Sequence, residues 1–351
     1  MRMHSQLRVA LAAPIRPEHV DLLRQLEPRI TVVHEAAALP PMRFPADFSG
    51  EPSFRRTPEA AEWWRAQLRD AEALYGIPDV DPALLAAVVR ENDGLRWVHT
   101  MAAGGGGQVR GAGLSTDDLE RVRFTTSAGV HGTSLAEFAL LGLLAGAKRL
   151  PRLRADQAAH RWPDRWVMDP VTGSTVLVLG LGGIGAEVAR TAAALGVHVI
   201  GASRSGRPVN GVAEVVTVDE LATILPRVDA VVSTLPGTAA TEGLIDAAFF
   251  DALRPGATFV NVGRGTVVDE DALLDALRSG RVGFAALDVV AVEPLAADSP
   301  LWDLPQVLIS PHTAALTVTE EERIVRLFAE NARRLLDGEP LRNVVDTVEF
   351  Y

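Results

Sequence analysis

The 351-residue sequence contains no cysteine, and this absence excludes several chemistries at once. Disulfide bonds, a catalytic thiolate, iron–sulfur clusters and cysteine-ligated zinc all require that residue. The eight histidines also show no paired ligand spacing, so we expect no metal site. A chain without cysteine fits a reducing compartment, and we expect a cytoplasmic protein.

The sequence also lacks long hydrophobic runs and an excess of basic residues. No stretch reaches the ~20 apolar residues of a membrane-spanning helix, and the longest candidate, Leu135 to Ala147, contains Glu137. The short apolar run from Val9 to Ile15 predicts a first buried strand rather than a signal peptide. Lys and Arg number 34 against 45 Asp and Glu, a formal net charge of −11. We therefore expect neither a nucleic-acid nor a membrane partner.

What is present indicates a globular protein of two α/β domains. Apolar residues make up 48% and charged residues 23% of a chain that is longer than one domain needs. In the first part, strand and helix patterns alternate around a Pro-rich loop from Leu39 to Pro58. The strands predicted there are Leu7–Ala13, Ile30–Val33, Ala73–Tyr75 and Leu95–His99, and the helices Pro17–Glu27, Thr57–Arg69 and Asp81–Arg90. That alternation predicts a parallel sheet covered on both faces.

A second βα series begins at Thr175 and predicts a doubly wound sheet. Its strands are Thr175–Leu179, His198–Ala202, Ala230–Ser233, Thr258–Val262, Gly283–Leu287 and Val307–Ile309. A long apolar helix, His131–Leu150, precedes this series and must be buried in a core or against another subunit. Arg152 to Pro170 reads as an irregular arm, and a last helix, Val318–Asp337, ends at Gly338.

The strand Val176–Leu179 runs directly into a G-x-G-x-x-G sequence that opens a helix. Gly180 permits a sharp turn, Gly182 lets the backbone approach a pyrophosphate, and Gly185 lets the helix pack on the strand. The N–H groups at the start of the helix, around Gly183 and Ile184, favour the negative phosphates. The segment therefore predicts a dinucleotide-binding site.

The end of the second strand of this series indicates which dinucleotide binds. An enzyme that uses NAD usually has Asp or Glu here, on the ribose 2′-OH, whereas this sequence has Ser203, Arg204 and Ser205, with Arg207 close by. Arg can pair with a 2′-phosphate that a carboxylate would repel, so we predict NADP(H). In the alternative interpretation Arg204 stacks on the adenine and either cofactor binds.

Four consecutive glycines, Gly104 to Gly107, follow the strand Leu95–His99. On composition alone they favour a flexible linker. The functional alternative is a loop whose bare backbone amides approach a small anion.

Three ionisable residues each follow a predicted strand of the second sheet, where a doubly wound fold lines its ligand crevice. Arg264 lies in N-V-G-R-G, Glu293 in L-D-V-V-A-V-E-P-L and His312 in S-P-H-T-A. Taken singly, each has an ordinary interpretation: a surface arginine, a solvated loop acid and a satisfied histidine at the start of a loop.

Together, and in this order, the four motifs resemble those of the D-isomer-specific 2-hydroxyacid dehydrogenases over roughly Thr125 to Gly338. Ser203-Arg204-Ser205 resembles the NADPH-preferring glyoxylate/hydroxypyruvate reductase branch. Gly263 departs from the Ala or Ser that is frequent there, which we interpret as neutral.

The resemblance implies a function and a catalytic set. His312 would be the acid–base group that protonates the carbonyl oxygen of a small 2-oxo acid, giving a D-2-hydroxy acid. Glu293 would stabilise the protonated imidazole, and Arg264 would bind the substrate carboxylate. In the reverse direction the same histidine, neutral, would act as base.

The resemblance also implies further binding residues. Ala103, Gly104 and Gly105 would hold the substrate carboxylate, which favours the anion-binding interpretation of the glycine tract. Residues implied to line the cofactor are Leu235, Pro236, Thr241, Val262, Gly263 and Asp288. Asp288 would meet the nicotinamide carboxamide, although an acid at a strand end can also simply cap a turn.

The fold implied is two Rossmann-like doubly wound parallel-sheet domains with the active site in the cleft between them. Residues 1–123 with 315–351 would form the substrate domain, and residues 124–314 the dinucleotide domain, which would dimerise through its long helix and arm. No regulatory domain is expected after Tyr351. The alternative function is a non-catalytic dinucleotide-sensing protein, as in the corepressors related to this family, which also keep Arg, Glu and His.

Overall fold

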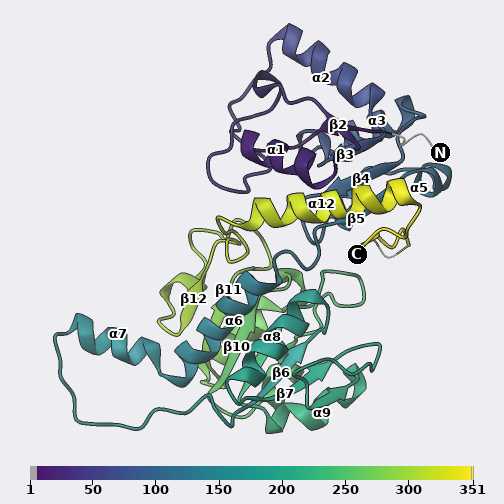
Figure 1. The fold of residues 1–351 in the computed structure, drawn as a ribbon. Coiled ribbons are helices and arrows are strands. Elements are labelled where there is room, and N and C mark those ends of the chain that lie inside the picture. The colour runs from purple at the N-terminus through teal and green to yellow at the C-terminus, as the bar shows by residue number, and fades with distance from the viewer. Residues whose placement is uncertain (1–5, 349, 351) are drawn as a thin grey trace. The chain divides into compact units, whose positions relative to one another are not determined.

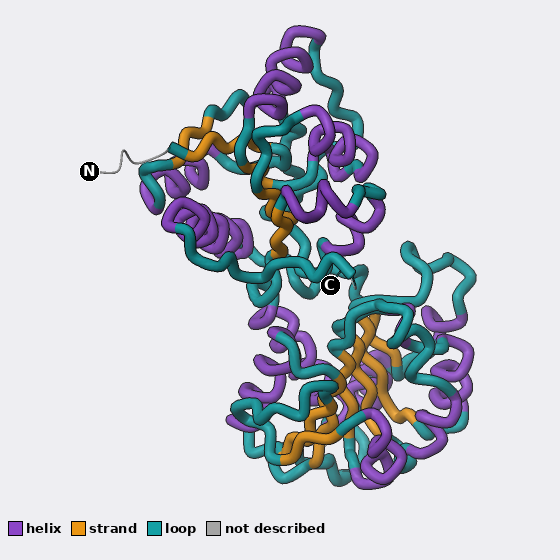
Figure 2. The backbone as a smooth tube through the Cα atoms, turned by 90° about the vertical axis from the view of Figure 1, so that its right-hand side faces the viewer, coloured by secondary structure: helices purple, strands orange, loops and turns teal. Residues whose placement is uncertain are grey.

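The computed structural model describes residues 6–348 and 350, and the chain divides into two compact units. The first contains residues 1–131 and 316–351, and the second contains residues 132–315. Each is a parallel sheet with helices, which confirms the prediction of two α/β domains with parallel sheets (Figure 2). None of the helices in the described part of the chain has the length and apolar character that a membrane span needs.

The first unit is built on a five-stranded parallel sheet in the order β2-β1-β3-β4-β5 (Figure 1). Its strands are β1 (Leu7–Leu11), β2 (Ile30–Val32), β3 (Ala73–Tyr75), β4 (Trp97–Thr100) and β5 (Arg123–Thr126). Its helices are α1 (Pro17–Leu26), α2 (Pro58–Asp70), α3 (Pro82–Glu91), α4 (Gly106–Gly111), α5 (Thr116–Arg121) and α12 (Glu320–Asp337), with short 3₁₀ turns η1 (Ala36–Ala38) and η2 (Pro78–Val80). The four strands predicted here are all present, and β5 is an addition.

Local sequence explains where the helices of this unit begin and end. The side chains of Thr57 and Asp81 accept N–H bonds at the starts of α2 and α3, and each helix has Pro at its first position. Helix α12 ends at Gly338, whose φ of 74° is the left-handed conformation expected past a helix end.

Helix α12 is far from the rest of this unit in sequence but part of its core. The ring of its Phe328 stacks on Trp97 of β4, with centroids 4.4 Å apart, and both side chains are fully buried. The C-terminal segment is therefore needed to complete the first unit.

The second unit contains a seven-stranded parallel sheet in the order β12-β11-β10-β9-β6-β7-β8. Its strands are β6 (Thr175–Leu179), β7 (His198–Ala202), β8 (Glu214–Val216), β9 (Ala230–Ser233), β10 (Ala257–Asn261), β11 (Val282–Leu287) and β12 (Val307–Ile309). Its helices are α6 (Gly132–Ala147), α7 (Leu150–Ala158), α8 (Gly183–Ala194), α9 (Leu221–Ile224), α10 (Ala247–Ala252) and α11 (Glu270–Arg278), with 3₁₀ turns η3 (Val218–Glu220), η4 (Leu225–Arg227), η5 (Gly265–Val267) and η6 (Pro300–Asp303). All six predicted strands are present, and β8 is an addition at the edge.

The predicted long helix and irregular arm need correction. The helix ends at Ala147, because Arg149 adopts the left-handed conformation with φ 53°. A second helix, α7, begins at Leu150, so residues 152–158 of the predicted arm are helical and only the segment after Ala158 is irregular. Figure 1 shows α7 and this segment extending away from the sheet of their own unit.

Candidate active site

The carboxyl ends of six neighbouring strands bring the predicted residues of the second unit to one edge of the sheet. Along the strand order, His312 follows β12, Asp288 and Glu293 follow β11, Arg264 follows β10, Leu235 and Pro236 follow β9, Gly180 follows β6, and Ser203 follows β7. The three ionisable residues thus belong to three adjacent strands. The glycine fingerprint lies further along the same edge.

His312 and Glu293 are in direct contact. Nδ1 of His312 lies 2.8 Å from Oε2 of Glu293, with both side chains partly exposed. If Nδ1 carries the proton given to the carboxylate, Nε2 is the ring nitrogen left to exchange a proton with another molecule.

Asp288 holds the turn that carries His312. Its Oδ1 accepts bonds from the Ser310 hydroxyl at 2.7 Å and from the N–H groups of Thr313 and Ala314 at 3.0 and 2.9 Å. Its backbone carbonyl accepts the His312 N–H at 2.9 Å. These bonds offset the cost of the left-handed conformation of His312, φ 53°. These hydrogen bonds are those of an acid that caps a turn at the end of a strand.

Arg264 lies on the neighbouring strand end, in a loop ordered by Asn261. The Asn261 side chain accepts the Gly263 N–H and donates to the Arg264 carbonyl, both at 3.1 Å. Nη1 of Arg264 donates to the Gly263 carbonyl at 2.8 Å. Within the described residues, Arg264 makes no hydrogen bond or ion pair with Glu293 or His312.

Gly263 is not a neutral departure, contrary to our interpretation of the sequence. A Cβ at this position would lie 2.5 Å from the Leu235 carbonyl oxygen and 2.8 Å from the Leu235 nitrogen. Buried Val262 precedes it. The loop after β9 therefore approaches too closely for Ala or Ser without a shift.

The fingerprint has the shape that a dinucleotide requires. A Cβ on Gly185 would lie 1.9 Å from the Gly180 carbonyl oxygen, whereas one on Gly182 would meet open space. Among the described residues, no acceptor takes the N–H groups of Gly182, Gly183 or Ile184 at the start of α8. These unpaired donors, at the positive end of a helix, fit a pyrophosphate.

The segment after β7 is a compact turn held by its own hydroxyl groups. Oγ of Ser203 lies 3.1 Å from Oγ of Ser205 and accepts the Ser205 N–H at 3.2 Å. Arg204 between them is exposed. At the loop after β9, the Thr241 hydroxyl donates to the Pro236 carbonyl at 2.6 Å and closes that turn.

In the first unit, the glycine tract is an ordered turn rather than a flexible linker. Residues 101–105 form a turn after β4, and α4 begins at Gly106. Gly105 packs so closely that a Cβ would lie 1.8 Å from Oγ1 of Thr100. In the part of the chain that the structure describes, the N–H groups of Ala103 and Gly104 donate to no acceptor.

A buried histidine lies near the end of β4, just before this turn. His99 of β4 contacts the hydroxyl groups of Thr125, at 2.8 Å, and Ser127, at 3.1 Å. Burial lowers the pKa of His99 to about 3. The ring is therefore neutral. Because it is fully buried, its role is structural.

Three residues that the sequence analysis did not single out order the site: Asn261, Ser310 and Glu270, whose Oε2 accepts the Ala291 N–H at 3.2 Å. The first two lay inside quoted motifs, so a signal was present. No group of three or more His, Asp or Glu side chains among the described residues could hold a metal ion.

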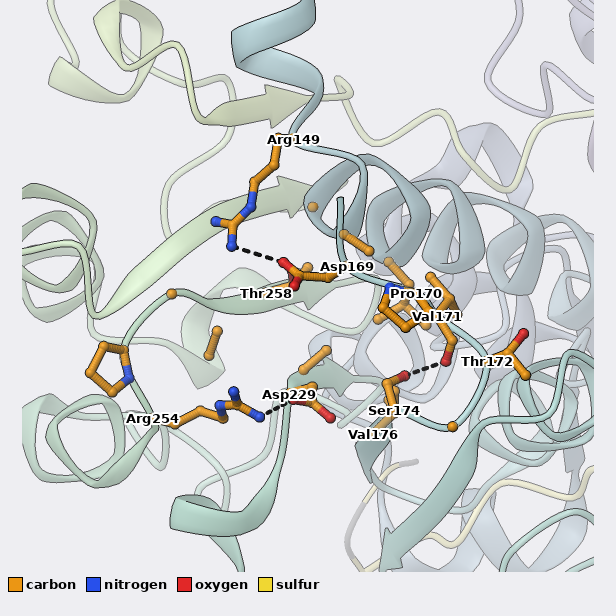
Figure 3. Close-up of a pocket in the computed structure, with 18 residues that line it drawn as sticks. Arg149, Asp169, Pro170, Val171, Thr172, Ser174, Val176, Asp229, Arg254 and Thr258 are labelled. Atoms are coloured by element: carbon orange, nitrogen blue, oxygen red, sulfur yellow. Dashed lines mark hydrogen bonds and ion pairs between the residues drawn. The ribbon is translucent and has the colours of Figure 1, made fainter. Parts of the chain in front are cut away.

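A cavity of about 310 Å³ lies at the opposite, amino-terminal edge of the same sheet (Figure 3). Val176, Ala230 and Thr258 mark the starts of β6, β9 and β10 in its wall. Its charged groups are paired with one another, Arg149 with Asp169 and Arg254 with Asp229. The cavity is thus separate from the candidate active site, which lies at the carboxyl ends of the strands. Sheets of this kind bind their ligands at the carboxyl ends.

Comparisons with known proteins agree with this geometry. Residues 140–314 match the model of the D-isomer specific 2-hydroxyacid dehydrogenase NAD binding domain. The chain is 34% identical over 234 residues to the (S)-sulfolactate dehydrogenase of Chromohalobacter salexigens, covering 64% of this chain and 75% of that protein. It is 39% identical over 250 residues to the D-3-phosphoglycerate dehydrogenase of Mycobacterium leprae, covering 68% of this chain but only 46% of that longer protein.

Solved structures extend the likeness to nearly the whole chain. The NADPH-dependent glyoxylate/hydroxypyruvate reductase of Sinorhizobium meliloti, in complex with NADP and sulfate, superposes with a TM-score of 0.77 at 28% identity, covering 99% of this chain and 100% of that one. A D-isomer specific 2-hydroxyacid dehydrogenase of Xanthobacter autotrophicus, in complex with NADPH and MES, gives 0.77 at 29% identity with the same coverage. The chain belongs to the D-isomer specific 2-hydroxyacid dehydrogenase family.

Proposed function

We propose that this protein reduces a small 2-oxo acid to a D-2-hydroxy acid with NADPH, and catalyses the reverse reaction. The observation that carries the proposal is the 2.8 Å contact between Nδ1 of His312 and Glu293, on the sheet edge that also presents Arg264 and the glycine fingerprint. The relatives named above as 3-phosphoglycerate, sulfolactate and glyoxylate/hydroxypyruvate enzymes support it, because those compounds are all 2-hydroxy or 2-oxo acids.

The residues at the edge fit NADPH. The unpaired N–H groups of Gly182, Gly183 and Ile184 would bind the pyrophosphate. Ser203, Arg204 and Ser205 would bind the 2′-phosphate, since no carboxylate ends β7 to repel it. Residues assigned to the rest of the cofactor are Gly180, Gly185, Leu235, Pro236, Thr241, Val262, Gly263 and Asp288. When bound, NADPH supplies the hydride.

The chain's own residues supply the proton and bind the substrate. His312 gives the proton on Nε2 to the carbonyl oxygen as negative charge grows there. Glu293 stabilises the imidazolium form through Nδ1 and holds the ring in place. Arg264 binds the substrate carboxylate through its guanidinium fork and polarises the carbonyl.

We assign the substrate carboxylate a second set of donors in the turn Ala103–Gly105. The unpaired N–H groups of Ala103 and Gly104 support this role. In this proposal residues 1–123 with 315–351 bind substrate, and residues 124–314 bind the cofactor.

We also propose a homodimer formed through α6, α7 and the segment after them. Leu141 and Leu144 are 48% and 41% exposed on one face of α6, and Trp162 is 99% exposed. Arg152 lies over the ring of Trp166 at 4.2 Å and braces this segment in the single chain. Exposed apolar side chains on a braced element favour a protein partner.

The test is NADPH oxidation, followed by absorbance, with glyoxylate, hydroxypyruvate and phenylpyruvate. Replacing His312 with Ala is expected to lower turnover by about 10²–10⁴-fold while the affinity for NADPH changes little. His198→Ala, an exposed histidine at the amino end of β7, is the matched control and should keep wild-type turnover. Tight NADPH binding by the wild type without turnover of any 2-oxo acid would establish a dinucleotide sensor instead.

A further inference from the structure

The loop between Asp288 and Glu293 carries two residues of the site, and its middle is held by a side chain from another element. We propose that Glu270 is a positioning residue, which fixes this loop and through it the pair of Glu293 and His312. The proposal rests on the proposed function, in which that pair manages the proton.

Glu270 is the first residue of α11, and its carboxylate reaches back to the loop. Oε2 accepts the N–H of Ala291, 21 residues further along the chain, at 3.2 Å. The side chain is half-buried. A charged acceptor on a backbone N–H makes a stronger hydrogen bond than a neutral one.

On its other side, the same loop lies against the residue that follows Arg264. A Cβ on Gly265 would fall 1.8 Å from the Val290 carbonyl oxygen and 2.6 Å from the Ala291 nitrogen. The loop backbone therefore occupies the space where any other residue would place its side chain. Glu270 and Gly265 together hold the peptide between Val290 and Ala291 from two sides.

This peptide is connected to Glu293 and His312 through one hydrogen bond of the loop. The Val290 N–H donates to Oε1 of Glu293 at 3.3 Å, and Oε2 of the same carboxylate contacts Nδ1 of His312 at 2.8 Å. A void of about 10 Å³ lies beside the loop, lined among others by Gly265, Glu270 and Ala291. Removing the Glu270 side chain would enlarge that void and free the Ala291 N–H, which gives the loop room to move.

Glu270 could also act simply by stabilising the start of α11. A substitution at Asp271 distinguishes this role from the positioning of the loop. An acid in the first turn of α11 stabilises the positive end of the helix. Asp271 occupies the same turn, is exposed, and makes no hydrogen bond or ion pair with another described residue. Asp271→Ala therefore removes the same charge from α11 without touching the loop.

The experiment compares Glu270→Ala, Glu270→Gln and Asp271→Ala in the full-length protein. Glu270→Ala is expected to lower kcat for 2-oxo acid reduction about 10- to 100-fold, as expected for a displaced catalytic group, with an unchanged Kd for NADPH. Glu270→Gln keeps an acceptor for Ala291 and should recover most of the activity, and Asp271→Ala should change it less than about twofold.

A readout independent of turnover keeps this proposal separate from the proposed function. The NMR signals of the His312 ring, assigned by their loss in His312→Ala, should differ in chemical shift from the wild type in Glu270→Ala and match the wild type in Asp271→Ala. Identical His312 ring signals in all three proteins would overturn the positioning role, whatever the activity. If the His312 signals change in Glu270→Ala but the wild type reduces no 2-oxo acid, only the proposed reaction is refuted.

Discussion

Arg204 stands where a carboxylate would fix a preference for NADH. It follows β7, between two serines whose hydroxyl groups hold the turn. Arg204→Ala is expected to raise the Kd for NADPH about 10- to 100-fold, the loss of charge-assisted bonds to a phosphate. The Kd for NADH should change less than about twofold, since that cofactor lacks the phosphate. Titration of cofactor fluorescence checks both values; equal losses would mean that Arg204 stacks on the adenine.

A second residue, His99, makes stability depend on pH. Burial lowers its pKa from 6.5 to about 3. Between pH 6.5 and pH 3 the unfolded chain binds a proton on His99 and the folded chain does not. The free energy of unfolding therefore has its full value above pH 6.5 and decreases as the pH falls toward 3. Each pH unit within the window costs about 1.4 kcal/mol.

Thermal unfolding followed by circular dichroism between pH 7 and pH 5 measures this dependence. The melting temperature of wild type should fall more steeply with decreasing pH than that of His99→Gln, which has no ring to protonate. Parallel curves for the two proteins would show that His99 does not carry the effect.

At this scale the residues to which we assign the chemistry have a clearer signal in the sequence than the residues that position them. Arg264, Glu293 and His312 each stand in a motif and each follow a strand, so they could be found in a linear reading. The bonds from Ser310 and Thr313 to Asp288 exist because β11 and β12 are neighbours. Strand adjacency is a property of the folded sheet, and no local pattern displays it.

At the scale of the elements, helix α6 packs closely on the sheet of its unit because it has glycine at the contact. A Cβ on Gly146 would lie 2.1 Å from Oγ1 of Thr258, a short and buried side chain of β10. Gly146→Ala is therefore expected to destabilise the second unit by about 1–3 kcal/mol. Gly107 in α4 meets nothing within 4 Å, so Gly107→Ala should stabilise the first unit by about 0.5–1 kcal/mol.

Denaturant unfolding of the two variants measures these opposite signs. Destabilisation by both substitutions would mean that helix α4 depends on glycine for a reason other than space, and an unchanged Gly146→Ala would mean that α6 can move away from β10.

Element boundaries could be predicted where a buried run meets glycine or a polar residue, as at Gly180 after β6 and at Ser203 after β7. Strand β8 was missed because it is a three-residue edge strand, mostly half-buried, and so lacks an apolar run. Helix α7 was predicted as irregular because Pro151 reads as an interruption, yet proline fits the first turn of a helix. The break between α6 and α7 depends on the left-handed conformation of Arg149. Arginine does not favour that conformation, so the sequence does not indicate the break.

For the whole molecule, the proposed dimer gives a prediction on mass. Leu141→Glu combined with Leu144→Glu places two charges on the exposed face of α6 and should convert the dimer to monomer, because burying unpaired carboxylates is costly. Analytical ultracentrifugation measures the mass. Leu26→Glu on α1, a leucine of similar exposure at 40%, is the control and should leave the mass unchanged. A double variant that remains dimeric would place the interface elsewhere.

The discontinuity of the first unit has a consequence for the order of events during synthesis. All of the second unit, residues 132–315, leaves the ribosome before α12, whose Phe328 stacks on Trp97. The nascent chain can thus complete the second unit while the first unit still exposes apolar surface on its sheet. Until translation reaches the last helix, that surface is open to chaperones, and a premature stop anywhere before α12 would leave it so.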